Sequence, residues 1–205
     1  APEIEGVTTS SFGAGVGNWN QTVYWPGSTE EERINMYVHR VDRDFFETLQ
    51  IDILEGKGLY NQLKRKDRYL YVINASASDY LGWESATGKS FSVFGNNHYG
   101  EIAGVSGDFK FRSLHHKVEP SAFILNDEAV PDRMHIRVMG SQTPQALKRI
   151  REKWELYAPP NAPYLLTSLE EDFEDLYAAE HRTQKIIVFF TGIAMIISFL
   201  GLTGL

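Results

Sequence analysis

The sequence predicts an α+β domain that continues into a long C-terminal helix. Short stretches with an apolar period of two, typical of strands, are interspersed with short stretches of helical spacing. The final stretch, residues 186–205, has no charged residue and no proline. Because a helix of about 20 predominantly apolar residues spans a bilayer, we expect a transmembrane helix there. The alternative is a helix buried in the core of a large soluble protein.

The N-terminal quarter predicts two main strands, a long loop and a short helix. Alternation of apolar and polar residues indicates half-buried strands, and an aspartate can cap a helix that follows it. The predicted elements are a strand at residues 3–10, a loop at 12–28 with a short strand at 21–25, a strand at 34–38, and a helix capped by Asp42 that carries Phe45, Phe46 and Leu49.

The rest of the body predicts further strands and two more helices. Asn74 is a suitable N-cap for a helix that ends at Gly82, and Pro144 is suited to the first turn of a helix with Thr143 as N-cap. That second helix places Leu147, Ile150, Trp154 and Tyr157 on one face. The predicted strands are residues 69–73, a hairpin of 90–94 and 99–105, then 122–125, 134–138 and 164–167, with a polar loop at 110–120.

The C-terminal helix has a clear predicted start. Ser168 and Glu171 have the spacing of a capping box, in which each side chain binds the backbone N–H of the other residue. No proline or glycine interrupts residues 169–191. One helix is therefore expected to begin in water and enter the membrane without a break, over roughly 55 Å at 1.5 Å per residue.

Composition excludes several functions. The 205 residues carry a net charge of −7, which argues against nucleic-acid binding because phosphate contacts need clustered Lys and Arg. We interpret the basic cluster at residues 64–66 and Arg68 as a solvated turn. The lack of cysteine excludes disulfides, thiolate metal sites and a cysteine nucleophile. Since the chain begins at Ala1 and stops within an apolar stretch, we expect a piece of a longer membrane protein.

Four short motifs suggest chemistry but do not support it. Gly88-Lys89-Ser90 lacks the first glycine of a phosphate-binding loop, because Trp83 stands at that position. Glycines at 13, 15 and 17 lack dinucleotide-fingerprint spacing. His115 and His116 have no partner at metal-ligand spacing, and the acidic run at residues 170–175 suits a helix start. We therefore predict no catalytic, cofactor-binding or metal-binding residues, and no enzyme activity.

Four further groups of residues follow one another in a characteristic order and spacing. They are Val41 to Ile51 followed by Leu54-Glu-Gly-Lys57; Val72-Ile-Asn74 with Leu81-Gly-Trp83 and Thr87-Gly-Lys89; Ile102-Ala-Gly-Val-Ser-Gly-Asp-Phe109 with Ser113-Leu-His115 and Glu119-Pro120; and Phe173 to Glu180 leading to Gly201-Leu-Thr-Gly-Leu205. Together they resemble FtsX-like, MacB-type ABC transporter permeases. Residues 1–32 match poorly, and Ala75 replaces the family's usual glutamate.

The resemblance implies an extracytoplasmic domain from such a permease, the second such domain of an eight-helix type. It implies a porter-like α/β-sandwich subdomain from residues 1–52 and 127–168, and an inserted, mostly-β, Sabre-like lobe from 53–126. A stalk helix at 169–185 and a transmembrane helix at 186–205 would follow. The transmitting element would be the helix over residues 169–205, and the loops 12–28 and 110–120 are candidate contact surfaces.

The resemblance also implies a location and partners. The chain would lie at the cell inner membrane, with its soluble domain in the periplasm. It would couple cytoplasmic ATP hydrolysis to periplasmic transport or extrusion by mechanotransmission, without enzyme activity or a cofactor of its own. The implied partners are a cytoplasmic ABC ATPase, a second permease copy, the membrane, and a periplasmic partner or exported substrate. The alternatives are a periplasmic ligand-sensing domain of a signalling protein and a membrane-anchored enzyme.

Overall fold

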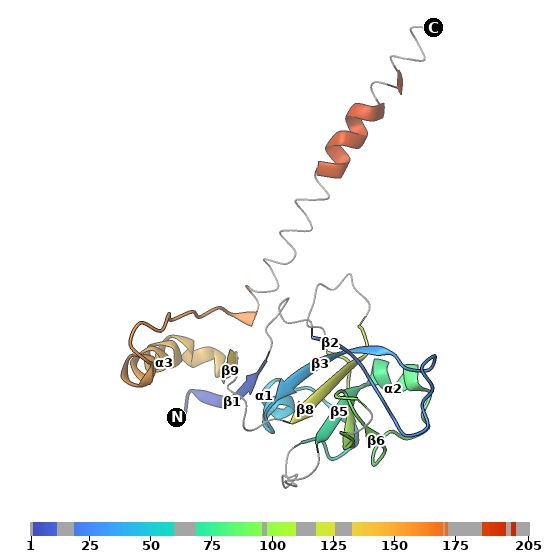
Figure 1. Cartoon of the computed structure of the whole chain (residues 1–205). Coiled ribbons are helices and arrows are strands. Elements are labelled where there is room, and N and C mark those ends of the chain that lie inside the picture. Colours follow the sequence, from blue (N-terminus) through green and yellow to red (C-terminus); the bar gives the residue numbers. More distant parts are fainter. Residues whose placement is uncertain are drawn as a thin grey trace.

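One mixed sheet organises the chain (Figure 1). The structure is a computed structural model that describes residues 2–11, 19–59, 69–95, 98–109, 118–125, 133–169, 171, 186–195 and 198–199. In these residues the strand order is β4 (Ile53–Gly56), β7 (Gly100–Ser106), β5 (Leu70–Asn74), β8 (Ser121–Leu125), β3 (Asn35–Val41), β1 (Ile4–Ser10) and β9 (Arg133–Val138). The short strands β2 (Asn20–Thr22) and β6 (Ser90–Phe91) pair with β3 and β7.

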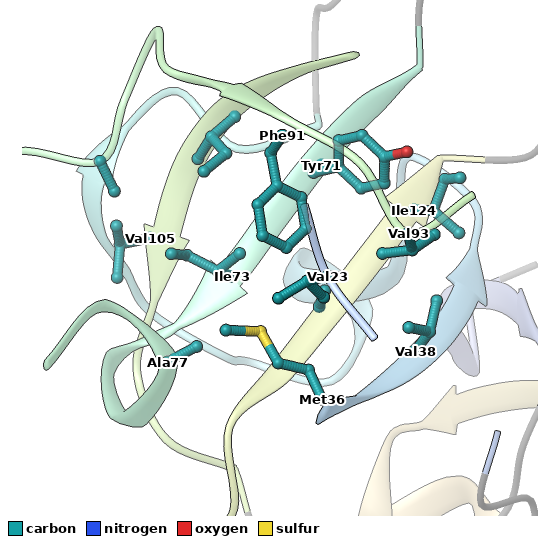
Figure 2. Packing of buried hydrophobic residues seen from close by; sticks show 13 residues of the cluster. Val23, Met36, Val38, Tyr71, Ile73, Ala77, Phe91, Val93, Val105 and Ile124 are labelled. Atoms are coloured by element: carbon teal, nitrogen blue, oxygen red, sulfur yellow. The ribbon is translucent and has the colours of Figure 1, made fainter. Parts of the chain in front are cut away.

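The centre of the sheet is buried on both faces. In β5, Tyr71 and Ile73 point into one apolar cluster and Val72 points into the other. Figure 2 shows the first cluster, where the Phe91 ring lies among Tyr71, Ile73 and Val23. A strand covered on both faces needs apolar residues at successive positions, which explains the continuous apolar run predicted at residues 69–73.

Two short helices close these faces. In α1 (Phe45–Thr48), Phe45 and Phe46 pack against Phe123 of β8 in the second cluster. The α2 helix (Ala75–Leu81) contributes Ala77 to the first cluster. The predicted Asn74 cap is confirmed, since its Oδ1 accepts from the Ala77 N–H at 3.0 Å. Gly82 ends α2 at φ +63°, a conformation that glycine adopts without strain.

Asn74 also connects the helix start to the sheet. Its Oδ1 accepts a second hydrogen bond, from the Ser121 N–H at 2.9 Å, and its Nδ2 donates to the Glu119 carbonyl at 3.1 Å. One buried amide therefore fixes the end of β5, the start of α2 and the start of β8. A buried amide that makes three hydrogen bonds stabilises this arrangement, whereas its loss would leave its buried partners unpaired.

The helix cap predicted at Asp42 is wrong. The N-cap of α1 is Asp44, and no side chain caps that helix. Asp42 instead accepts hydrogen bonds from the hydroxyls of Thr8 and Thr9 and from the Thr9 N–H, and its Oδ1 also accepts from the Asp44 N–H at 3.1 Å. The partner strand β1, distant in sequence, competes with the local helix for this carboxylate.

Two further predictions need correction near the C-terminus. The α3 helix (Thr143–Tyr157) has Gln142 as N-cap, after the short helix η1 (Gly140–Gln142), and Thr143 is its first residue. Residues 164–167 form no strand, because no neighbouring strand pairs with them in the described sheet. The hairpin at residues 90–105 is confirmed, although β6 is only two residues long.

The sheet continues across the predicted domain boundaries. β3, from the segment 1–52, pairs in parallel with β8, from the predicted lobe 53–126, over Tyr37–Val41 and Ser121–Leu125. β1 pairs with β9, which comes from the segment 127–168. The boundaries at 52/53 and 126/127 thus coincide with no break in the sheet, and the division into a porter-like subdomain and a Sabre-like lobe stays a prediction.

Close backbone packing at Gly100 leads to a stability prediction. A Cβ at this position would overlap the Tyr69 carbonyl and lie 2.7 Å from Cε2 of the buried Tyr71. We expect Gly100→Ala to lower the free energy of unfolding by about 2 kcal/mol or more, because a packed core must move to admit the methyl group. Urea unfolding in mild detergent, followed by tryptophan fluorescence, measures the change.

The matched control is Gly140→Ala, since a Cβ at Gly140 would meet no atom within 4 Å. We expect this variant to change the unfolding free energy by less than about 0.5 kcal/mol. Equal effects of the two substitutions would contradict the close packing at Gly100.

Candidate functional site

An exposed apolar helix at the C-terminal end is the first component of the candidate site. Residues 186–195 and 198–199 are helical, and their large apolar side chains are solvent-exposed, with Val188 at 71%. This segment stands apart from the sheet (Figure 1). The described residues of this helix are therefore not buried against the rest of this chain. Exposing so much apolar surface to water is unfavourable, so this surface calls for a lipid or protein environment.

The predicted transmembrane helix, residues 186–205, is longer than the part of it that the structure describes. Residues 196–197 and 200–205 lie outside the described part of the chain, as does most of the predicted stalk, residues 170 and 172–185. Within the residues that the structure describes, no single helix combines the length and apolarity needed to cross a bilayer. The continuous helix from residue 169 to residue 205 thus stays a prediction.

The start of the C-terminal helix is confirmed as a capping box. The Ser168 N–H donates to Glu171 Oε2 at 3.0 Å, and the Glu171 N–H donates to Ser168 Oγ at 3.0 Å. This reciprocal pair satisfies two backbone donors at a helix start. These two hydrogen bonds fix the helix start at Ser168, where the preceding irregular segment ends.

The segment before Ser168, residues 158–167, is called the linker here. It follows α3 and lies against it through one aromatic residue. The Tyr164 ring lies 5.8 Å from the Trp154 ring, and the Arg151 guanidinium lies 5.7 Å from the Tyr164 ring. Such ring and cation–π contacts contribute about 0.5–1 kcal/mol each at exposed sites. The contact thus attaches the linker, near its middle at Tyr164, to Trp154 in the C-terminal part of α3.

The base of α3 is attached to the body by an ion pair. Arg149 Nε lies 2.7 Å from Glu3 Oε1, and the Glu3 side chain is almost fully buried. The Glu3 carbonyl also accepts from the Met139 N–H at 3.0 Å. Sequence reasoning missed this pair, because nothing local connects residue 3 with residue 149. We call α3, the linker and the Ser168–Glu171 capping box the junction, since they connect the body to the apolar helix.

Most of the rejected motifs have a structural explanation where they are described. Gly88 has φ +82°, which suits a turn, and Lys89 Nζ lies 5.1 Å from the Trp83 ring. A strand follows at Ser90 rather than the helix that a phosphate-binding loop requires. The glycines at 13–17, the cluster at 64–68, the histidines at 115–116 and most of the acidic run at 170–175 lie outside the described residues.

Histidine chemistry in the body is limited by burial. Burial lowers the pKa of His39 to about 4, so this side chain is neutral at pH 7. Its ring lies 5.3 Å from the Phe123 ring in the second cluster. His135 Nε2 is 2.7 Å from Ser10 Oγ, on neighbouring strands. Among the described residues, no three His, Cys, Asp or Glu side chains form a group that could hold a metal ion.

Glu55 has the most strongly perturbed carboxyl in the described body. Hydrogen bonds from the Ser85 hydroxyl at 2.6 Å and from the side chain and N–H of Thr87 lower the pKa of Glu55 to about 2. Perturbed pKa values often mark functional sites. Here the hydrogen bonds attach β4 to the loop before β6, which is a structural role. Sequence reasoning missed it, since its partners are thirty residues away.

Searches against protein-family descriptions and curated proteins find no match. Solved structures do match. A permease-protein domain from Porphyromonas gingivalis has a TM-score of 0.55 at 14% identity, covering 78% of this chain and 67% of that one. The extracellular domain of the ABC-type transporter YknZ from Gram-positive bacteria gives 0.47 at 12%, covering 75% and 78%. The periplasmic region of MacB from Actinobacillus actinomycetemcomitans gives 0.45 at 10%, covering 75% and 68%.

The first of these likenesses shows the fold. At 14% identity and a TM-score of 0.55, the chain shares the α+β architecture of a permease-protein domain. The fold class predicted from strand and helix patterns is therefore confirmed. What such a domain does is a separate question, since one fold can host unrelated functions.

The hydrogen bonds of Glu55 lead to a pH-dependent stability prediction. Its pKa is about 2 in the folded chain and near 4.5 when unfolded. The stabilisation is therefore fully present above pH 4.5 and is lost as the pH falls toward 2. We expect Glu55→Gln to cost about 1 kcal/mol of unfolding free energy at pH 7, since the site is largely solvated. Urea unfolding at pH 7, 4.5 and 2.5 measures it.

The matched control is Glu84→Gln, an exposed glutamate on the loop that Glu55 holds. The difference between wild type and Glu55→Gln should shrink at pH 2.5, whereas Glu84→Gln should match wild type throughout. A Glu55→Gln difference that stayed constant with pH would contradict the lowered pKa.

Proposed function

We propose that this chain is the extracytoplasmic domain of an FtsX-like, MacB-type ABC transporter permease. The observation that carries the proposal is the junction, which attaches an α+β body through a capped helix start to an exposed apolar helix. The motif order along residues 34–205 and the fold shared with a permease-protein domain support it. The body would lie in the periplasm and the apolar helix in the inner membrane.

The proposed role is mechanical coupling without enzyme activity. A cytoplasmic ABC ATPase would hydrolyse ATP, and the resulting helix motion would pass through the junction to the periplasmic body. Such coupling needs the parts of the junction to move together as one lever, because a flexible linker between them would absorb the displacement. The Glu3–Arg149 ion pair, the Tyr164–Trp154 ring contact and the Ser168–Glu171 capping box are the connections that would transmit it.

The proposed partners follow from this role. They are the ATPase, reached through the rest of the permease, a second permease copy, and a periplasmic partner or exported substrate. The loops at residues 12–28 and 110–120 are the proposed contact surfaces of the body. The net charge of −7 disfavours nucleic acid as a partner.

The association with an ATPase is directly testable. We expect the full-length protein, solubilised from its native membrane in mild detergent and captured by an affinity tag, to carry an ABC ATPase in fixed stoichiometry. The complex should hydrolyse ATP, and orthovanadate should inhibit it. Quantitative mass spectrometry and phosphate release measure both properties.

The membrane topology of the body is measured in the same strain with a cysteine in place of Tyr80, a residue that is exposed on α2. Residues 1–205 contain no cysteine, so with any cysteine elsewhere in the protein replaced by serine, a membrane-impermeant maleimide should label Tyr80→Cys in intact cells with a permeabilised outer membrane. Capture without an ATPase, or labelling only after cell lysis, would contradict the proposal. A captured histidine kinase would favour the sensor alternative.

A stiff connection predicts that a flexible insertion uncouples the two sides. We expect a Gly-Ser pair inserted beside His181 in the full-length protein to leave ATPase association intact but to abolish the transport-dependent phenotype of the strain, because two flexible residues interrupt a helical connection. Complementation of a gene deletion measures it.

The control is a Gly-Ser pair inserted after Gly82, an exposed helix end at φ +63° where a Cβ would meet nothing within 4 Å and which lies outside both proposed contact loops. That insertion should leave complementation unchanged. Unimpaired complementation by the His181 insertion would rule out rigid transmission while leaving the permease proposal standing.

A further inference from the structure

We infer that α3 is a hinged arm that closes onto an open face of the sheet and carries the linker and Ser168 with it. The target is the pair of strands β1 and β9, called the ribbon here. This inference goes beyond the proposed function, since it concerns a motion of the body that the geometry supports whatever the chain transports.

Among the described elements, cover is found on only one face of the ribbon. On one face, α1 packs closely against the ribbon. A Cβ added at Gly6 would lie 3.0 Å from the Thr48 hydroxyl, and the His135 ring lies 6.4 Å from the Phe45 ring. On the other face, Val7 lies opposite Ile136, and Met134 follows two residues along. Val7 is 42% exposed and Met134 is 62% exposed. In Figure 1 the ribbon lies between α1 and α3.

The α3 helix also has an apolar stripe that becomes more exposed toward its C-terminal end, where the Tyr164 ring of the linker lies beside Trp154. Ala146, Ile150, Trp154 and Tyr157 lie within about 100° of each other around a helix of 3.6 residues per turn. Along this stripe, Ala146 is fully buried, Trp154 is 38% exposed and Tyr157 is 75% exposed. A helix lying flat on a sheet would show even burial, so α3 diverges from the body toward its C-terminal end.

The lengths of the two uncovered surfaces match. The short connection at residues 139–142 reverses the chain between β9 and α3. From Ala146 to Trp154 the helix advances about 12 Å at 1.5 Å per residue, and from Val138 back to Met134 the strand advances about 13 Å at 3.3 Å per residue. When α3 lies flat along β9, Trp154 and Tyr157 therefore reach the exposed Met134. Closing would remove both apolar surfaces from water.

The base of the arm has the features of a hinge. Gly140 opens the short helix η1, and a Cβ there would meet nothing within 4 Å. Single turns of this tighter helix type are common connectors at the start of an α-helix, and their hydrogen bonds have poorer geometry than those of the α-helix that follows. The Glu3–Arg149 ion pair holds α3 near its middle, through the long Arg149 side chain. No glycine or proline interrupts α3 after its first turn, so the helix turns about η1 as one piece, and the Tyr164–Trp154 contact makes the linker follow it.

Crosslinking in the full-length protein tests closure. Residues 1–205 contain no cysteine, so Met134→Cys with Tyr157→Cys gives a defined pair once any cysteine elsewhere in the full-length protein is replaced by serine. We expect a short bismaleimide to link this pair within one chain about tenfold faster than the control pair Met134→Cys with Glu155→Cys, because Glu155 lies on the opposite side of α3. All three positions are exposed, and equal melting temperatures verify that both variants fold.

A second variant tests the surface that closure would bury. Val7→Lys, added to the first pair, should slow its crosslinking about tenfold, since closing the arm would bury a charged ammonium. Val7→Thr keeps the side-chain shape and should change the rate less than about threefold. Three outcomes would overturn the inference: equal rates for the two cysteine pairs, links found only between two copies on a denaturing gel, or no effect of Val7→Lys.

Discussion

Burial of both faces of the central strands is the constraint on which the rest of the structure depends. Val72 and Phe123 face one cluster, whereas Tyr71, Ile73 and Ile124 face the other. Each fully buried side chain of this size contributes about 1.5–3 kcal/mol relative to an exposed one, so both faces must find a cover. The helices α1 and α2, the strand pair around Phe91 and the loop carrying Val23 supply it.

Buried or half-buried polar side chains hold these covers in place. Asn74 fixes α2 to β5 and β8, Asp42 fixes the start of α1 to β1, and Glu55 fixes β4 to the loop before β6. In each case one side chain accepts hydrogen bonds from segments distant in sequence. At Asn74 the donors are buried, so another arrangement of the apolar layers would leave them unpaired. At Glu55 the donors are exposed, and the hydrogen bonds only favour the observed position of the loop. These residue types would suit a chemical site, but their contacts account for them structurally.

The ribbon of β1 and β9 differs from the centre because, among the described elements, α1 alone packs on it. On its second face Val7 and Met134 are exposed, and the helix that follows β9, α3, is attached to the body through Arg149 near its middle. The interior of the central sheet is close-packed, whereas α3 is exposed toward its C-terminal end.

The sequence by itself determined the features that arise from local patterns. The apolar run at residues 69–73, the Asn74 cap, the Gly82 helix end, the hairpin before residue 105 and the Ser168–Glu171 capping box all depend on residues within a few positions of each other. The sequence also indicated that the last helix would not pack against the body, since a long helix without charge needs an apolar environment.

Only the tertiary structure decided which distant segments meet. The Glu3–Arg149 ion pair, the role of Asp42 and the single sheet across the predicted boundaries at residues 52 and 126 depend on chain reversals that no local pattern encodes. Residues 164–167 have the composition of a strand, yet a strand forms only where a neighbour offers its backbone. Tyr164 lies instead on Trp154 of α3.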